Sequence, residues 1–207
     1  MKKFLFTMVL SLMSVVCVNA QNQTSNDSKF FVNTGATCVV PLTSGVLNTI
    51  MNEPIYTFNV EGGYNITNHI SANVHGGYAD EFNKTDEFSN VNGFTVGCNG
   101  DYHIQLNKKP ILNLIDCEAN GGLKFDYFNM TQKYTSGDVF GRPITKYDAY
   151  HALFITPYVG CTFKFNLDKN KKTQIIASQQ LNYMRAFQDN VGSDLTVNCY
   201  LGFRYNF

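Results

Sequence analysis

The chain has 207 residues, with 16 basic and 16 acidic side chains, so its formal net charge is zero; 44% of the residues are hydrophobic and 14% aromatic. A neutral chain with no basic stripe argues against nucleic-acid binding. Its length fits one domain, and after Val18 it holds no apolar run of 18 residues, so no transmembrane helix is predicted.

The first twenty residues, MKKFLFTMVLSLMSVVCVNA, read as an export signal. Two lysines precede an apolar run over 4–18, and small residues end at Ala20, which is the pattern of a secretory signal peptide. A lipoprotein anchor at Cys17 is the alternative, but Val16 precedes it where a small residue is usual. The sequence therefore predicts a signal peptide over 1–20, with cleavage after Ala20, and a flexible polar tail over 21–28.

Five cysteines remain after cleavage, an odd number for an exported protein. They cannot all pair within one chain, and without a C-x-x-C spacing a zinc site is not expected. One interpretation is that the thiols are reactive or lipidated; the other is that cysteine serves here as a small hydrophobic side chain. We therefore expect free, lipid-facing thiols and no disulfide at Cys38, Cys98, Cys117, Cys161 and Cys199.

Period-two alternation dominates the rest of the chain. Eight segments match or exceed the roughly 9–11 residues that a tilted strand needs to cross a bilayer. In the fourth, for example, Phe94, Val96 and Cys98 share one face while Thr95 and Asn99 share the other. The segments are 29–40, 54–66, 68–79, 91–106, 111–128, 150–167, 173–187 and 194–207.

A secreted β-sandwich would show the same alternation, but two features favour a barrel. Aromatic residues gather at the ends of the apolar faces, as in an interfacial girdle. The links also alternate between short and long, with long ones at 41–53, 80–90 and 129–149; the short link 188–193 departs from this pattern. The sequence predicts an all-β fold over 29–207, an eight-stranded antiparallel up-and-down transmembrane β-barrel.

The final residues, YLGFRYNF, complete this pattern with Leu201, Phe203, Tyr205 and Phe207 at alternate positions. With the signal peptide and the eight segments, they give a chain that resembles the small outer-membrane β-barrel family of the OmpA/OmpX type. The resemblance implies a bacterial outer-membrane location with both termini in the periplasm, contact with membrane lipid and lipopolysaccharide, and recognition of the last strand by the barrel-assembly machinery. Because the chain ends with its last predicted strand, no peptidoglycan-binding domain is expected after the barrel, which departs from the two-domain members of the family.

Charged residues of both signs fall on the inward faces. An ion or proton relay is one interpretation; we favour a salt-bridged network that fills a narrow bore, because buried charges need partners. Tyr158 and Tyr200 are expected to add bulk and plug the bore. The inward set comprises Glu61, Asp101, Asp116, Glu118, Asp126, Lys124, Lys164 and Arg204, joined by His69, His75 and His103.

No nucleophile elbow or metal pattern is present, so the sequence predicts no catalytic, cofactor-binding or metal-binding residues, no cofactor and no enzymatic activity. Some eight-stranded barrels are lipid-modifying enzymes, and His151 beside Asp148 and Tyr150 keeps that as a lesser alternative. A narrow channel for small solutes is another.

The leading prediction is a structural or surface-interaction role in membrane integrity, adhesion or defence. Surface ligands are expected at loop 129–149, where aromatic residues alternate with cations. Loop 80–90, with four acidic residues, is expected to be solvated, with cation bridging to lipopolysaccharide as the alternative. The aromatic and cationic residues of loop 129–149 are Tyr134, Phe140, Tyr147, Lys133, Arg142 and Lys146.

Overall fold

The computed structural model describes residues 29–42, 54–79, 88–104, 115–137, 143–168, 170–187 and 193–207. The predicted signal peptide 1–20 and tail 21–28 lie outside the described residues. No helix in the described ranges is long and apolar enough to cross a membrane.

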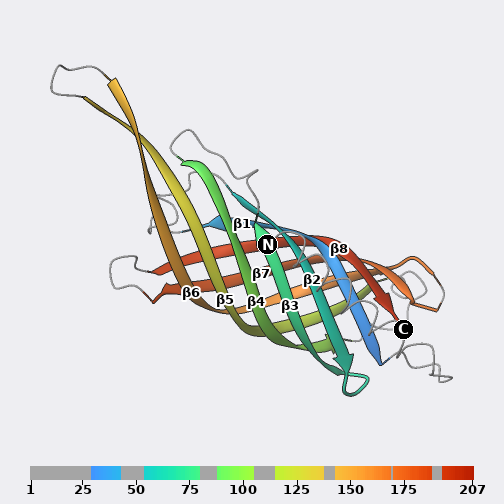
Figure 1. Ribbon diagram of the computed structural model, residues 1–207. Coiled ribbons are helices and arrows are strands. Elements are labelled where there is room, and N and C mark those ends of the chain that lie inside the picture. The colour runs from blue at the N-terminus through green and yellow to red at the C-terminus, as the bar shows by residue number, and fades with distance from the viewer. Residues whose placement is uncertain are drawn as a thin grey trace.

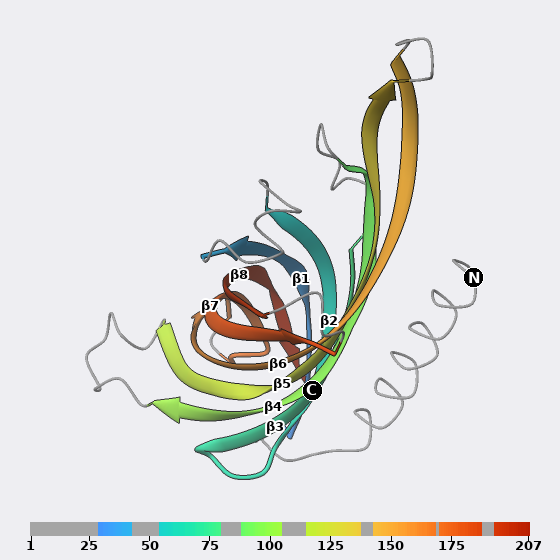
Figure 2. The ribbon, with the colours of Figure 1, turned by 90° about the vertical axis from the view of Figure 1, so that its left-hand side faces the viewer.

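Eight antiparallel strands form one closed barrel in sequence order (Figures 1 and 2). Each strand pairs with its neighbours in the chain, and β1 pairs with β8, so the predicted fold is confirmed. Closure leaves no edge along the wall, which satisfies the backbone groups. The strands are β1 (Phe30–Pro41), β2 (Ile55–Asn65), β3 (Ile70–Ala79), β4 (Phe88–Ile104), β5 (Ile115–Gly137), β6 (Pro143–Asn166), β7 (Thr173–Ala186) and β8 (Ser193–Asn206).

The last strand is paired to its final residue. The register between β1 and β8 runs from Phe31 opposite Asn206 to Pro41 opposite Thr196, and the backbone N–H of Phe207 donates to the carbonyl oxygen of Phe30 at 2.9 Å. Both ends of the described chain therefore lie at one end of the barrel, called the terminal end below. The opposite end, where β5 and β6 join, is called the hairpin end.

The expectation of a long irregular loop over 129–149 is wrong. β5 and β6 stay paired from Ile115 opposite Phe165 to Gly137 opposite Pro143, so 129–137 and 143–149 are strand. This hairpin rises well beyond the rest of the wall (Figure 1). Its sequence, NMTQKYTSG and PITKYDA, has polar residues at both alternating positions and few apolar ones, so the period-two apolar signal on which the prediction rested is weak there.

The outward faces of the strands are apolar, as the alternation predicted. Exposed large hydrophobic residues include Phe58, Val74, Val159 and Leu201, each more than 60% exposed. Aromatic residues lie towards the strand ends, such as Tyr56 on β2. The five described cysteines are free and at least partly exposed, on these outward faces. Such a wall matches the apolar band of a membrane barrel.

Candidate functional site

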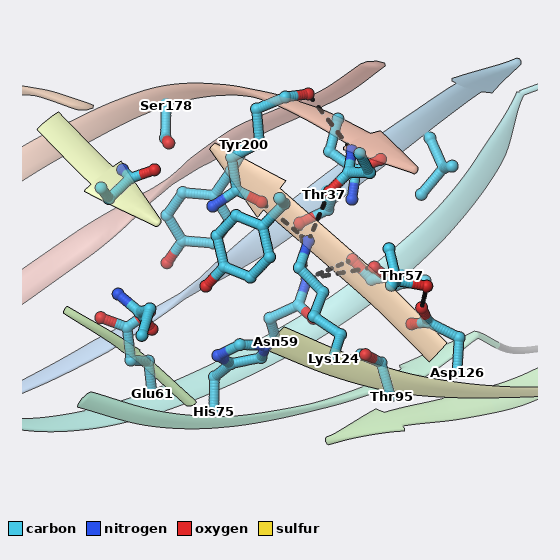
Figure 3. A pocket seen from close by; sticks show the side chains of 18 of the residues that line it. Thr37, Thr57, Asn59, Glu61, His75, Thr95, Lys124, Asp126, Ser178 and Tyr200 are labelled. Carbon is cyan, nitrogen blue, oxygen red and sulfur yellow. Dashed lines mark hydrogen bonds between the residues drawn. The ribbon is translucent and has the colours of Figure 1, made fainter. Parts of the chain in front are cut away.

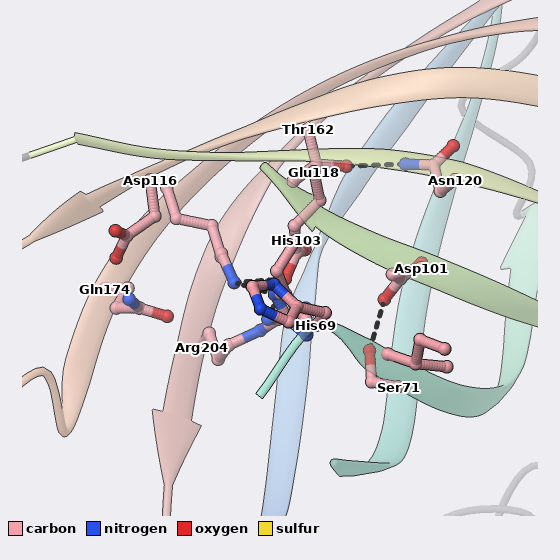
Figure 4. Close-up of polar contacts among 12 residues, drawn as sticks. His69, Ser71, Asp101, His103, Asp116, Glu118, Asn120, Thr162, Gln174 and Arg204 are labelled. Carbon is pink, nitrogen blue, oxygen red and sulfur yellow. Dashed lines mark hydrogen bonds and ion pairs between the residues drawn. The ribbon is translucent and has the colours of Figure 1, made fainter. Parts of the chain in front are cut away.

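A cluster of polar contacts around Glu118 lies in the bore near the terminal end (Figure 4). The Glu118 carboxylate is 1% exposed and pairs with Lys164, with Arg204 Nη1 at 3.3 Å and with His103 Nδ1 at 2.5 Å. The three partners come from β6, β8 and β4, while Glu118 lies on β5. One carboxylate therefore ties together strands from several sides of the wall.

Besides its ion pair with Glu118, the Arg204 side chain is held by a hydrogen bond and by an aromatic ring. Its Nε donates to Asn33 Oδ1 at 2.8 Å, and its guanidinium lies over the Phe31 ring at 3.9 Å. The Phe31 ring fits because Gly63 faces it: a Cβ at Gly63 would lie 2.1 Å from the ring. The amide of Asn33 in turn donates to Glu61 at 2.8 Å.

A second ion pair lies at the rim of the terminal end. Lys171, in the turn between β6 and β7, contacts both oxygens of Asp116 at 3.0 Å, and Asn166 donates to the same carboxylate at 3.1 Å. Both charged side chains are substantially exposed. Solvent screening makes such a pair weak, at about 0–1 kcal/mol.

Other buried carboxylates are held by neutral groups. Asp101 accepts from Ser71 at 3.1 Å and from Asn73 at 2.6 Å, and Asp126 accepts from Thr156 at 2.6 Å. Hydroxyl and amide donors can satisfy a carboxylate without a cation. The expectation that the inward charges all pair with opposite charges is therefore wrong for Asp101 and Asp126.

Lys124 is a buried cation that is likewise held by neutral groups. Its ammonium donates to Gln180 at 2.8 Å and to Asn182 at 3.1 Å, and it lies over the Tyr158 ring at 4.2 Å. Within the described part of the chain, Lys124 makes no ion pair. Two amide oxygens and an aromatic face replace a carboxylate here.

A polar cavity occupies the middle of the bore, with Glu61, His75, Lys124 and Tyr200 on its walls (Figure 3). Its volume, about 90 Å³ of space open to the centre of a water molecule, suffices for several waters. The predicted bulk of Tyr158 and Tyr200 is present, but it does not fill the bore. Several buried lining oxygens have no hydrogen-bond partner among the described residues, namely those of Thr95, Asn120, Thr196 and Asn198, so the cavity suits water.

An apolar layer borders the cavity towards the hairpin end. The rings of Phe128 and Phe154 meet edge to face with centroids 6.2 Å apart, and Phe154 is 1% exposed. Sequence reasoning missed this layer because near the hairpin end both alternating positions are apolar, as at Leu153 and Phe154, so period two does not mark the inward side. The layer consists of Val39, Ile55, Ala79, Phe128, Ala152, Phe154 and Met184.

Most side chains predicted to face inward do so, including Glu61, Asp116, Glu118, Lys124, Lys164 and Arg204. His75 lines the cavity and His103 contacts Glu118. His69 is the exception, and its predicted inward position is wrong. It lies exposed in the turn over 66–69, where its ring stacks on Tyr102.

His151 lies on the outer part of β6, away from the bore. Its Nδ1 is 3.0 Å from the Tyr127 hydroxyl, and the two rings stack. The side chains of Asp148 and Tyr150 lie outside the described ones. No group of three His, Cys, Asp or Glu side chains in the described ranges could hold a metal ion.

Comparison with solved structures identifies the fold. Neisserial surface protein A (NspA) superposes with a TM-score of 0.52 at 13% identity, over 88% of this chain and 98% of that protein. Ail, the attachment invasion locus protein of Yersinia pestis, gives a TM-score of 0.52 at 10% identity, over 87% and 99%. No protein-family model and no curated protein sequence matches the chain. The chain has the fold of the small outer-membrane β-barrels.

Proposed function

We propose that this protein is an integral outer-membrane barrel with a closed bore, and that it acts through its surface-exposed end in a structural or surface-interaction role. The observation that carries the proposal is that two packed layers of side chains lie in the interior. The Glu118 cluster lies on one side of the polar cavity and the Phe128–Phe154 layer on the other. A bore with two such layers does not suit the passage of sugars or nucleotides, so the activity falls to the exterior.

The two ends of the barrel support the proposed orientation. Short turns at 66–69 and 167–172 lie at the terminal end, and the polar β5–β6 hairpin projects from the other. Short periplasmic turns and longer extracellular connections are typical of outer-membrane barrels. The proposal places both termini in the periplasm and the hairpin outside the cell.

The hairpin is the proposed working part. It combines Lys133, Lys146 and Arg142 with Tyr134 and Tyr147 in its sequence, a mixture suited to protein surfaces and to anionic headgroups. Its register allows a clean test, because Gln132 pairs with Asp148. Replacing 133–147 by Asn-Gly, a two-residue hairpin turn, shortens the hairpin without shifting the strands below.

Whole cells carrying either version should then be compared for adhesion to protein-coated surfaces and for binding of anionic lipid vesicles. The shortened protein should keep the heat-modifiable gel mobility of a folded barrel and lose the binding. A matched variant with Lys133, Arg142 and Lys146 changed to Gln separates the cations from the hairpin's length. Unchanged binding by the shortened, folded protein would refute the role of the hairpin.

A narrow channel is the second candidate, favoured by the polar cavity and its unpartnered oxygens. Purified protein in a planar bilayer distinguishes the two functions. The closed-bore proposal expects no steady conductance from the unaltered chain. Large porin-like currents would support the channel instead.

A further inference from the structure

Gln179 is a polar residue on the outward wall, halfway along β7. The outward positions of this strand are Thr173, Ile175, Ala177, Gln179, Leu181, Tyr183 and Arg185, and of these Gln179, Leu181, Tyr183 and Arg185 are exposed. On the outward face of β7, Gln179 lies midway between Ile175 and Tyr183. Its amide is therefore near the middle of the apolar band. This inference rests on the proposed membrane location.

An amide in this position has unmet hydrogen-bonding capacity. Between the aromatic ends of the described strands, Gln179 is the only outward-facing amide or charged side chain, and the structure gives it no hydrogen bond within the described residues. Lipid chains offer no donor or acceptor, and an amide carries two of each. Polar side chains in a membrane are commonly satisfied by a neighbouring protein surface.

The neighbours of Gln179 allow such a surface to approach closely. Gln179 lies directly between Cys161 on β6 and Cys199 on β8 in the strand registers, and Cys38 on β1 lies directly opposite Cys199. Small side chains flanking one polar group are typical of packed interfaces in membranes. The side chains around Gln179 are therefore small, and a second surface can come close to its amide.

We propose that this patch, formed by Gln179, Cys161, Cys199 and Cys38, is the contact between two copies of the chain. An amide is complementary to itself, since it both donates and accepts, so a two-fold axis beside Gln179 pairs it with the same residue of the second copy. The same axis sets β6 of one copy against β8 of the other, small residues against small residues. A second copy can therefore supply hydrogen bonds to the Gln179 amide without any other protein.

The native thiols provide the test. Each variant keeps one outward thiol, the other described cysteines being changed to Ala. A variant that keeps Cys161 is co-expressed with one that keeps Cys199, because the proposed axis sets these two positions against each other; the control pair combines a variant that keeps Cys98, exposed on β4 across the barrel, with the Cys199 variant. A short membrane-permeable bismaleimide, applied to membranes, should yield covalent dimers from the first pair and not from the control pair. Adding Gln179→Leu to both chains of the first pair should weaken dimerisation roughly three- to thirty-fold, the effect of losing a hydrogen bond within a membrane.

Membrane insertion and heat-modifiable mobility are measured on every variant. Equal cross-linking of the two pairs of variants, or cross-linking that Gln179→Leu leaves unchanged in a folded, inserted protein, would overturn the dimer. Loss of membrane insertion in the unaltered chain would instead overturn the proposed location, so the two failures are distinguishable.

Discussion

Glu118 and Arg204 meet across the bore, with Nη1 and Oε1 3.3 Å apart, although β6 and β7 lie between their strands in the wall. The two residues are 86 positions apart in the chain. The contact depends on closure of the barrel, because only then do β5 and β8 face each other. It is thus a sensitive reporter of correct assembly.

Removing the Glu118 charge should destabilise the barrel. Glu118→Gln leaves Lys164 and Arg204 buried with no carboxylate between them, which costs about 3–5 kcal/mol. Urea unfolding in detergent micelles measures the loss. Asp116→Asn is the control, since that pair is exposed and should cost at most about 1 kcal/mol. Equal losses for the two variants would contradict a buried ionic closure.

The apolar layer should matter both for stability and for sealing. Phe154→Ala removes a ring that is 1% exposed and should cost about 3–5 kcal/mol. It also removes the partner of Phe128, but the Glu118 cluster still lies on the other side of the cavity, so small currents in a planar bilayer are expected only when Phe154→Ala is combined with Glu118→Ala. The control combines Glu118→Ala with Phe163→Ala, on the outward wall and 43% exposed, and should leave the bilayer silent. Silence from a folded protein with both Phe154→Ala and Glu118→Ala would show that other residues seal the bore.

The thiols test the register of closure. Cys38 lies directly opposite Cys199, so their Cα atoms should be about 5 Å apart. Reducing and non-reducing gels of the untreated protein should agree, because the described thiols are free. A short bifunctional thiol reagent should then join Cys38 to Cys199 within one chain, as peptide mass spectrometry will show. A Cys38–Cys98 link in monomeric protein would contradict this closure.

Asp168 should make stability depend on pH. Its carboxylate accepts the backbone N–H of Thr173 at 2.6 Å, and those of Lys172 and Asn170, and these bonds lower the pKa of Asp168. A lowered folded-state pKa gives stability that is present above the unfolded pKa and is lost as pH falls through the folded pKa. Asp168→Asn should therefore lower the unfolding midpoint at neutral pH, and the two proteins should converge in acid. A constant difference down to the lowest pH would assign the effect to something other than the charge.

The terminal residue should matter for assembly. Phe207 meets Tyr205 edge to face and bonds to the backbone of Phe30, and the resemblance to the outer-membrane family predicts that the assembly machinery reads this end. Phe207→Ala should reduce the heat-modifiable, folded fraction in cells far more than Asn206→Ala. The Asn206 control is demanding, because its amide donates to the carbonyl oxygen of Lys171 at 2.6 Å. Equal folded fractions would remove the proposed role of Phe207.

Alternation along the chain was enough to predict the strands and their faces. Alternation placed Phe94 and Cys98 outward and Glu118 and Arg204 inward, because a strand sends successive side chains to opposite sides of the wall. It could not mark the β5–β6 hairpin beyond Asn129, where polar residues lie at both alternating positions and apolar ones are few, or the inward Phe128–Phe154 layer, where both positions are apolar.

The contacts between inward residues could not be predicted in this way, because they depend on how the barrel closes. Glu118 takes Lys164, Arg204 and His103 together, while Asp101 and Lys124 find neutral partners. Those choices depend on how closure and stagger of the strands bring distant positions to one level of the bore. The position of Gln179 among three cysteines has the same origin, since the registers of β7 with β6 and β8 and of β1 with β8, not the sequence spacing, bring these residues together.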